Sequence, residues 1–227
     1  MTIFVLKIIA CISMILDHIK YVIPETINIA TLYLGRIAFP LFAFIAVEGY
    51  LHTSDLKRYI KRLIIFGLIS QIPYMLFKSS IVKEYILEVN VIFTLLLGII
   101  SILIYEKSKN KYFGFLIALI LCIIGQVIKV DYGWYGVGLV FLIYLIKNNK
   151  IKFIIFYILY TLLYYFFTFI KLNFILTINY LPYMICSIIP VILMIMYNGK
   201  LGKKLKYFYY WFYPIHMLIL FIVSKLV

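Results

Sequence analysis

The sequence predicts an all-α helical bundle embedded in a membrane, and three observations predict it. Of the 227 residues, 66% are hydrophobic and 13% are charged, whereas a soluble domain has about 45–50% apolar and about 25% charged residues. Long apolar segments recur along the whole chain, separated by short basic gaps. Because lipid offers no hydrogen bonds, such segments span as helices or as a closed barrel. They do not alternate like barrel strands of about ten residues, so helices are predicted.

About nine segments have the length that a bilayer requires. Their expected limits are 3–23, 29–51, 59–77, 89–105, 112–128, 133–147, 151–170, 174–197 and 207–226. Pro182 and Pro190 both fall in the eighth segment, so a kink or a break is predicted there. No linker, repeat or low-complexity tract interrupts the series, and we expect one compact domain over residues 1–227.

The basic residues predict the orientation in the membrane. Fourteen of the 22 Lys and Arg residues lie in alternate gaps, which are DLKRYIKR (55–62), EKSKNK (106–111), KNNKIK (147–152) and NGKLGKKLK (198–206). The other gaps and the C-terminal end hold six, and Lys7 and Arg36 lie inside spans. The positive-inside rule therefore places the N-terminus in the cytoplasm. It also explains the net charge of +14 without a nucleic-acid partner.

Polar residues inside the predicted spans are the candidates for function, because a charge deep in a bilayer is costly and is usually retained for a purpose. The candidates are Lys7, Asp17, His18, Arg36, Glu48, Asn90, Asp131 and His216. The three cysteines are scattered through apolar segments, and their spacing is not that of a metal site or a disulfide.

Lys7 and His18 are predicted to lie on one face of the first span. Eleven steps of about 100° return to within about 20° of the start, and they separate the two residues by about 16 Å along the helix. Cys11 and Met14 lie on the same face. Counted from the cytoplasmic boundary, His18 is about 22 Å deep and Arg36 about 20 Å deep, so the two are expected to be level on adjacent antiparallel helices.

This arrangement suits a phosphorylated carrier with a long, thin arm, such as acetyl-CoA. Its phosphates would bind basic residues at the cytoplasmic side through charge-assisted hydrogen bonds, and these residues are Lys7, Arg58, Lys61 and Arg62. Its reactive end would reach His18, which would act as a general base or take the acyl group itself. Asp17 lies about 100° around the helix from His18, so we expect it to pair with Arg36 or Lys20 instead.

Other polar residues have simpler explanations. Glu48, His52 and Asp55 border a cytoplasmic loop, where a solvated cap is the expected role. Asp131 lies in the segment DYGWYG, whose glycines and Asp are typical of a turn. His216 lies in mid-span, either as a buried hydrogen bond between helices or as a second catalytic group.

Several blocks of the chain resemble the TraX family of membrane proteins. They are LKIIACISMILDHIKYV, GRIAFPLFAFIAVEGYLHTSDLKRYIKRL, ISQIPY, DYGWYGVG and YWFYPIHM, in this order from about residue 6 to about residue 218. The best-known member of this family is implicated in N-terminal acetylation of a conjugative pilin subunit. The family is similar to the wider group of transmembrane acyltransferases, which use cytosolic acetyl-CoA and carry a basic residue, ten intervening positions and a histidine in the first span.

The resemblance implies roles for individual residues. It implies that His18 is the catalytic histidine and that Lys7, Arg58 and Arg62 contact coenzyme A. Motif positions without equally clear roles are Asp17, Arg36, Glu48, Gly49, His52, Asp131 and His216. The acceptor stays open as a peptide or pilin N-terminus, or a glycan. The abundance of Lys, Ile, Tyr and Asn suggests an AT-rich bacterial genome, so the expected location is a bacterial plasma membrane.

The sequence therefore favours a multi-pass acetyltransferase that moves an acetyl group from acetyl-CoA to an amine or hydroxyl near the outer face. Arg36 or His216 would stabilise developing negative charge. One alternative is a transporter or permease, in which buried charges form a substrate pathway. The other is an assembly factor of a conjugation or secretion system without chemistry of its own.

Overall fold

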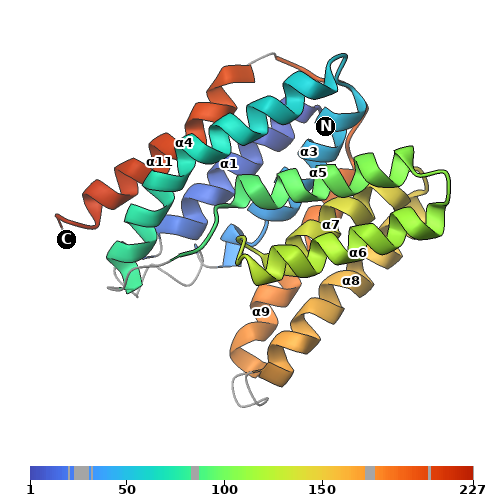
Figure 1. Cartoon of the computed structure of the whole chain (residues 1–227). Helices are drawn as coiled ribbons and strands as arrows, with labels where there is room; N and C mark the ends of the chain where they lie inside the picture. Colours follow the sequence, from blue (N-terminus) through green and yellow to red (C-terminus); the bar gives the residue numbers. More distant parts are fainter. Residues whose placement is uncertain are drawn as a thin grey trace. The chain divides into compact units, whose positions relative to one another are not determined.

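A computed structural model describes residues 1–19, 21, 22, 31, 33–82, 87–171, 177–203 and 206–226. Within these ranges the chain is helical, and the all-α prediction is confirmed (Figure 1). The helices are α1 (Ile3–Ile19), α3 (Ala38–Leu51), α4 (Leu56–Val82), α5 (Val91–Lys107), α6 (Lys111–Val127), α7 (Gly133–Ile146), α8 (Lys150–Lys171), α9 (Thr177–Ile188), α10 (Pro190–Ile195) and α11 (Lys206–Val223). Each predicted span overlaps one of these helices, except that α9 and α10 share the eighth. Residues 20, 23, 29, 30, 32 and 174–176 of the predicted spans lie outside the described part of the chain.

Among the described residues, three helical segments are long and apolar enough to cross a membrane. They are Tyr33–Leu51, which includes α3, then α4 and α8. The other apolar helices of the described residues are shorter, and their crossing of a bilayer stays a prediction. The largest difference from the sequence prediction is in α4, which has 27 residues and runs on past the expected end at residue 77. Lys78, Ser79 and Ser80 lower the local hydropathy there, but none of them prevents a helix from continuing.

The break predicted in the eighth span lies between α9 and α10. Pro190 is the first residue of α10 and has no backbone N–H to donate to the preceding turn. Just before the break, the Ser187 carbonyl accepts a hydrogen bond from the Tyr157 hydroxyl at 2.7 Å. The Ser187 hydroxyl lies 2.8 Å from the hydroxyl of Tyr165. Tyr157 and Tyr165 of α8 therefore form hydrogen bonds next to the helix break, where lipid would supply none.

The described helices group into two compact units. Unit 1 comprises residues 1–45 and 145–204, and unit 2 comprises residues 46–144 and 205–227. Unit 1 contains α1, the first half of α3, and α8 to α10. Unit 2 contains the rest of α3, then α4 to α6, most of α7, and α11. The expectation of a single domain stays a prediction.

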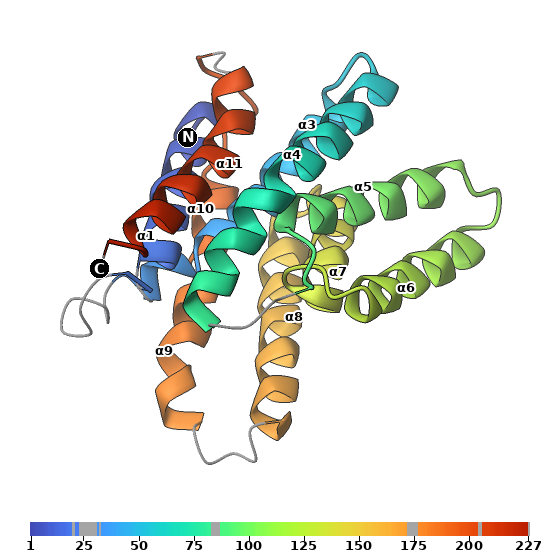
Figure 2. The ribbon, with the colours of Figure 1, turned by 60° about the vertical axis from the view of Figure 1, so that its left-hand side comes forward.

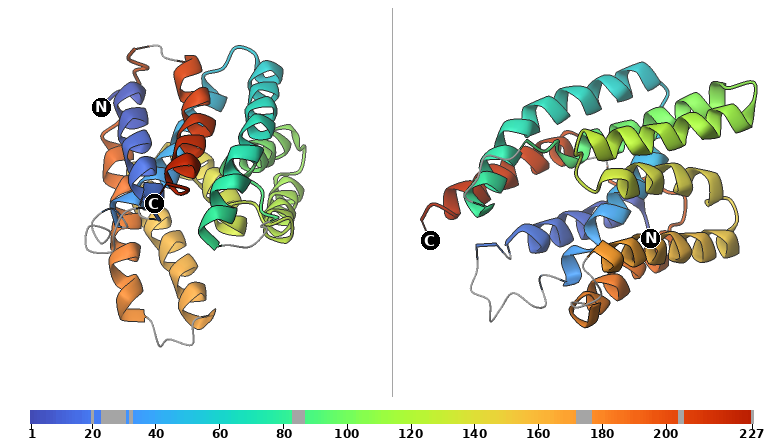
Figure 3. Two further views of the ribbon diagram at one scale, coloured as in Figure 1. Left: turned by 90° about the vertical axis from the view of Figure 1, so that its left-hand side faces the viewer. Right: turned by 60° about the horizontal axis from the view of Figure 1, so that its bottom comes forward.

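In unit 1, the start of α1 is held by the segment that follows α10. The backbone N–H groups of Ile3 and Phe4 donate to the carbonyls of Lys200 and Leu201 at 3.0 and 3.1 Å. These N–H groups have no partner inside the helix, so the segment supplies what the helix end lacks. Elsewhere in this unit α8 and α9 run side by side (Figure 3).

In unit 2, α4 packs against α11, and α5 packs against both α4 and α6 (Figures 1 and 2). The buried residues of α6 are the small ones, Gly114, Ala118 and Gly125. A Cβ atom on Gly125 would lie 2.9 Å from the side chain of Val137, so this glycine permits a close helix contact. Small residues at such contacts are typical of helices that pack in membranes.

Candidate functional site

The first candidate residues lie on α1, which runs without interruption from Ile3 to Ile19. Lys7 and His18 therefore share one helix face, as the spacing predicts. Cys11 and Met14, between them, are buried, whereas Lys7 and His18 are partly buried. The stripe next to this face is buried along its whole length and consists of Ile3, Leu6, Ala10, Ser13 and Asp17.

Asp17 forms an ion pair with Arg36, through Oδ1 and the guanidinium Nη2. Of the two partners expected for Asp17, Arg36 is confirmed, while Lys20 lies outside the described residues. The Arg36 guanidinium also lies over the ring of Tyr183, 5.9 Å from its centroid. Two elements of unit 1 thus hold this cation beside the aspartate that precedes His18. Arg36 therefore lies beside the end of α1 that carries His18, and the depth of both residues in a membrane stays a prediction.

Gly35 allows this pair to form. A Cβ atom at this position would lie 2.6 Å from both Cα and Cβ of Asp17 and 2.7 Å from its Oδ1. Such distances are too short for any other residue without movement of the backbone. The Gly35–Arg36 dipeptide therefore combines a close approach to α1 with the side chain that neutralises Asp17.

The predicted cofactor-binding cations Arg58, Lys61 and Arg62 lie in the first two turns of α4, in unit 2. Asp55 precedes this helix and accepts a hydrogen bond from the Arg58 N–H at 2.8 Å, so the predicted cap is confirmed. The Arg58 side chain is also paired with Asp55, at 3.2 Å. Lys61 is exposed.

Arg62 is held by aromatic side chains. Its Nε donates to the Tyr210 hydroxyl at 3.4 Å, and its guanidinium carbon lies 5.9 Å from the ring centroid of Tyr59. Tyr210 in turn stacks on Phe66, with ring centroids 4.8 Å apart. Both arginines are therefore held before any ligand binds, Arg58 by a carboxylate and Arg62 by aromatic side chains. That these cations share a passage with Lys7 and His18 stays a prediction.

Glu48 and His52 form a pair at the end of α3, in unit 2. The His52 Nδ1 lies 3.5 Å from the Glu48 carboxylate and 2.9 Å from the Glu48 carbonyl oxygen. Glu48 is 5% exposed, so the prediction of a solvated cap is wrong for this residue. The position of Glu48 next to a loop in the sequence suggested that its side chain faces solvent, but on α3 the carboxylate is buried. The prediction holds for the exposed His52, which caps the last turn of α3.

Asn90 and Asp131 belong to a network that joins loops of unit 2. Asn90 is fully buried and caps α5 by accepting from the Ile92 N–H, and its amide donates to the carbonyl of Gly67 at 2.8 Å. The Asp131 carbonyl accepts from the Thr94 hydroxyl at 2.5 Å. Left-handed backbone at Lys129, Tyr132 and Gly133 confirms the predicted turn around Asp131. For Asn90 these contacts indicate a structural role.

His216 is buried in α11, and its Nδ1 lies 2.9 Å from the carbonyl oxygen of Phe212 in the same helix. Its ring stacks on that of Phe212, with centroids 5.0 Å apart. Because a carbonyl only accepts, Nδ1 carries a proton, and the neutral ring has its lone pair on Nε2. The choice between a helix–helix hydrogen bond and a catalytic role for His216 stays a prediction.

With this geometry established, the chain can be compared with known proteins. The sequence profile described as TraX protein matches residues 3–224. The chain belongs to the TraX family. In the described part of this TraX chain, no three His, Cys, Asp or Glu side chains are grouped so that they could hold a metal ion.

A curated relative of this TraX protein is named "Probable fimbrial assembly protein FimC, serogroup H1", from Dichelobacter nodosus. The two sequences are 30% identical over 143 residues, which cover 59% of this chain and 58% of the relative. The chain thus matches little more than half the length of that protein. No solved structure matches the chain significantly.

Sequence reasoning missed two polar clusters in the TraX chain. Near the end of α5, Glu106 accepts hydrogen bonds from the hydroxyls of Tyr50 and Tyr144, at 2.5 and 2.7 Å. At the start of α5, Glu88 binds Lys78 and the Tyr74 hydroxyl. The partners of Glu106 are 56 and 38 residues away in the sequence, so no local spacing could have indicated them. Lys78 and Glu88 are ten residues apart in the sequence, which is also a weak signal.

Proposed function

We propose that this TraX protein is a multi-pass enzyme of the bacterial plasma membrane that transfers an acetyl group from cytosolic acetyl-CoA. The acceptor is an amine or hydroxyl near the outer face, such as a peptide or pilin N-terminus or a glycan. Lys7, Arg58, Lys61 and Arg62 would bind the phosphates of the co-substrate. His18 would act on the thioester end.

The observation that carries this proposal is the Arg36 guanidinium held against Asp17, the residue that precedes His18. Attack on a thioester carbonyl places negative charge on its oxygen, and a cation that is already oriented stabilises that charge most effectively. Asp17 and Tyr183 fix Arg36 in this way, and Gly35 brings it close to α1. A histidine next in sequence to an aspartate that fixes a guanidinium is a suitable combination for acyl transfer.

In the proposed reaction the acceptor amine attacks the thioester carbonyl carbon. Its nitrogen forms the new bond to carbon, the carbon–sulfur bond breaks, and coenzyme A leaves as a thiolate. His18 accepts the proton that the amine loses and returns it to the thiolate or to solvent. Alternatively the His18 imidazole attacks the thioester carbon first and then transfers the acetyl group to the amine. The overall reaction is the same, but it proceeds in two steps through an acetylated imidazole.

Transfer from labelled acetyl-CoA by protein reconstituted in vesicles tests this proposal. The acceptors are a peptide with a free N-terminus and the same peptide with a blocked N-terminus and one serine. We expect His18→Ala to lower transfer by about 100-fold or more. Ile12→Ala, on an exposed part of α1, is the matched control and should keep wild-type transfer. Unchanged transfer by His18→Ala would remove His18 from the mechanism.

A second candidate is an assembly factor without catalysis, favoured by the name of the Dichelobacter relative. The double variant Lys7→Gln/His18→Ala separates the two. An assembly factor would restore surface fimbriae or pili to a strain that lacks the gene even with both substitutions, whereas an acetyltransferase would leave the subunits unacetylated. Mass spectrometry of the assembled subunits shows whether they are acetylated.

A further inference from the structure

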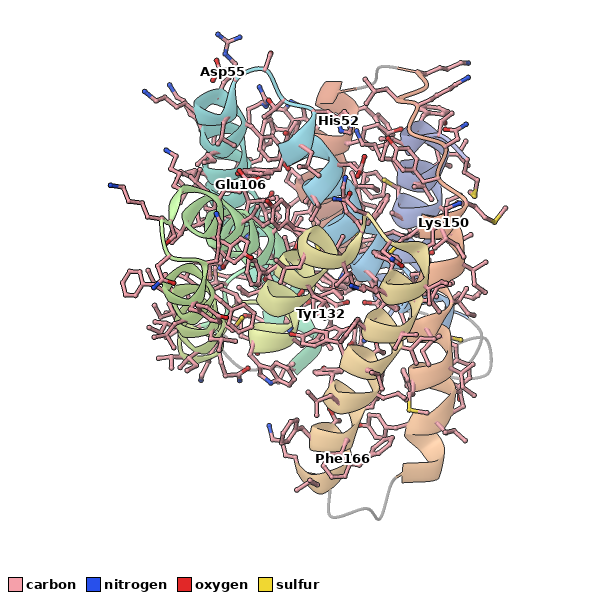
Figure 4. The ribbon with its side chains drawn as sticks, turned by 90° about the vertical axis from the view of Figure 1, so that its right-hand side faces the viewer. His52, Asp55, Glu106, Tyr132, Lys150 and Phe166 are labelled. Atoms are coloured by element: carbon pink, nitrogen blue, oxygen red, sulfur yellow. The ribbon has the colours of Figure 1, made fainter. Side chains whose placement is uncertain are left out.

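A second acid–histidine pair lies at the end of α3, outside the proposed centre on α1. Glu48 is buried, whereas the side chain of His52 is 52% exposed. Figure 4 shows His52 at the end of α3 and Asp55 at the start of α4, with a short loop between them. The proposed acetyl transfer assigns neither Glu48 nor His52 a role.

The contacts of His52 determine which ring nitrogen is available. Both groups near Nδ1, the Glu48 carbonyl at 2.9 Å and the Glu48 carboxylate at 3.5 Å, are acceptors. Nδ1 therefore carries the proton, and in the neutral ring the lone pair is on Nε2. A half-exposed histidine whose Nδ1 proton is held by a backbone carbonyl, with a buried carboxylate 3.5 Å away, is arranged as a nucleophile or a base.

A simple cap would not require this arrangement. The hydrogen bond to the Glu48 carbonyl is enough to satisfy the last turn of α3. The carboxylate adds the cost of a buried charge and gives in return a negative group that stabilises positive charge on the imidazole.

The pair is fixed to the cationic turns of α4. The Tyr59 hydroxyl donates to the Ala46 carbonyl at 3.1 Å, which ties the first turns of α4 to α3. Gly49 allows this contact, because a Cβ atom there would lie 3.2 Å from the same hydroxyl. Tyr59 also lies under Arg62. The last turn of α3, with His52, and the cations of α4 thus belong to one packed arrangement inside unit 2.

We propose that Glu48 and His52 form a second reaction centre, at which His52 accepts an acetyl group from a thioester held through its phosphates by the cations of α4. This inference rests on the proposed function, since it takes acetyl-CoA as the ligand. His52 is the catalytic residue, and Glu48 is a positioning residue that acts through it.

The step balances without any further reactant. The lone pair of Nε2 attacks the carbonyl carbon, a nitrogen–carbon bond forms, the carbon–sulfur bond breaks, and coenzyme A leaves as a thiolate. The proton on Nδ1 stays in place, and the Glu48 carboxylate offsets the positive charge of the acetylated ring. In the reverse step a free coenzyme A thiolate attacks the acetyl group and restores the thioester.

The centre therefore has a measurable activity of its own, which is exchange between acetyl-CoA and labelled coenzyme A with no acceptor present. In reconstituted protein we expect His52→Ala and His52→Gln to lower this exchange by about 100-fold or more. Added imidazole should partly restore it in His52→Ala but not in His52→Gln, whose larger side chain occupies the site. Glu48→Gln should lower the maximal rate of exchange by about tenfold and leave the KM for acetyl-CoA unchanged.

Three further measurements separate chemistry from folding and from ligand binding. Leu68→Ala, at an exposed position farther along α4, is the control and should exchange at the wild-type rate. Arg62→Gln should raise the KM for acetyl-CoA, and it should not change the rate with S-acetyl-N-acetylcysteamine, which has no phosphates. Thermal unfolding of each variant in detergent identifies any loss that comes from misfolding.

The outcomes distinguish this inference from the proposed function. It is supported if His18→Ala loses transfer to the peptide and still exchanges, while His52→Ala does not exchange and is rescued by imidazole. It is overturned if wild-type protein transfers acetyl to the peptide but shows no exchange, or if a folded His52→Gln exchanges normally. Absence of both transfer and exchange in folded wild-type protein would overturn the proposed function as well.

Discussion

The Asp17–Arg36 pair of unit 1 and the Glu48–His52 pair of unit 2 join the same kinds of groups in different surroundings. Arg36 and Asp17 come from different helical segments, and their side chains are only 23% and 13% exposed. Glu48 and His52 lie one turn apart on one helix, with 6% and 52% of their side chains exposed. The first pair is enclosed by its neighbours, whereas the second keeps one partner accessible. Enclosure suits a group that fixes a charge, and access suits a group that reacts.

Breaking the enclosed pair should have the largest effect. Asp17→Asn leaves the Arg36 charge without its carboxylate in a mostly buried position, so we expect a loss of about 3–5 kcal/mol in the free energy of unfolding. Thermal or denaturant unfolding in detergent measures this. The double variant Asp17→Asn/Arg36→Gln removes both charges and should recover part of the loss. A single variant as stable as the wild type would contradict the view that the pair is enclosed.

The next effect comes from the glycine beside each pair. Gly35→Ala places a methyl group 2.6 Å from the Asp17 backbone, and we expect a loss of about 1–3 kcal/mol from overpacking. Gly49→Ala should cost less, since the nearest atom is the hydroxyl at the end of the Tyr59 side chain, at 3.2 Å. Unfolding of the two variants under the same conditions gives the comparison. The reverse order of effects would show that α3 and α4 are the more tightly packed region.

Removing the charge of the accessible pair should affect stability little. In Glu48→Gln the His52 ring stays half-exposed and solvated, so we expect a change of about 1 kcal/mol or less. The same unfolding measurement, set beside that of Asp17→Asn, tests the contrast directly. Equal losses for the two substitutions would mean that both pairs are structural.

The smallest effect is the pH dependence of stability that comes from the Glu88–Lys78 pair. This pair serves as a reference for the Asp17–Arg36 and Glu48–His52 pairs. Burial raises the pKa of Glu88, but the hydrogen bond and charge of Lys78 outweigh it and hold the pKa below its usual range. A lowered pKa in the folded state gives stability that is present above the pKa of the unfolded chain and is lost as pH falls through the folded pKa. The Glu88 side chain is 35% exposed, so solvent screens the pair and the loss is about 1 kcal/mol or less.

Unfolding temperatures between pH 7 and pH 3 measure this loss, and Lys78→Gln provides the control. Without its cation, Glu88 should protonate at a higher pH, so the variant should lose less stability on acidification than the wild type. A steeper loss in Lys78→Gln would assign the acid sensitivity to other carboxylates.

Local features of the fold and the site could be predicted from the sequence, and contacts between distant segments could not. Apolar length located the helices, and Pro190 located the break between α9 and α10. Depth counting along two antiparallel spans anticipated the Asp17–Arg36 pair. The burial of Glu48 was missed because it depends on how its helix is turned against neighbours. The two tyrosines on Glu106 were missed for the same reason, since they come from α3 and α7.

The length of α4 has a consequence for how the protein would work in different lipids. Its 27 residues extend about 40 Å, whereas the hydrocarbon core of a bilayer is about 30 Å thick. The surplus of about 10 Å equals the stretch from Leu56 to Arg62, so an upright helix would place its cations among the lipid headgroups. Under the proposed function, anionic lipids would then compete with acetyl-CoA for the same side chains, and the lipid composition would set the apparent affinity for this co-substrate.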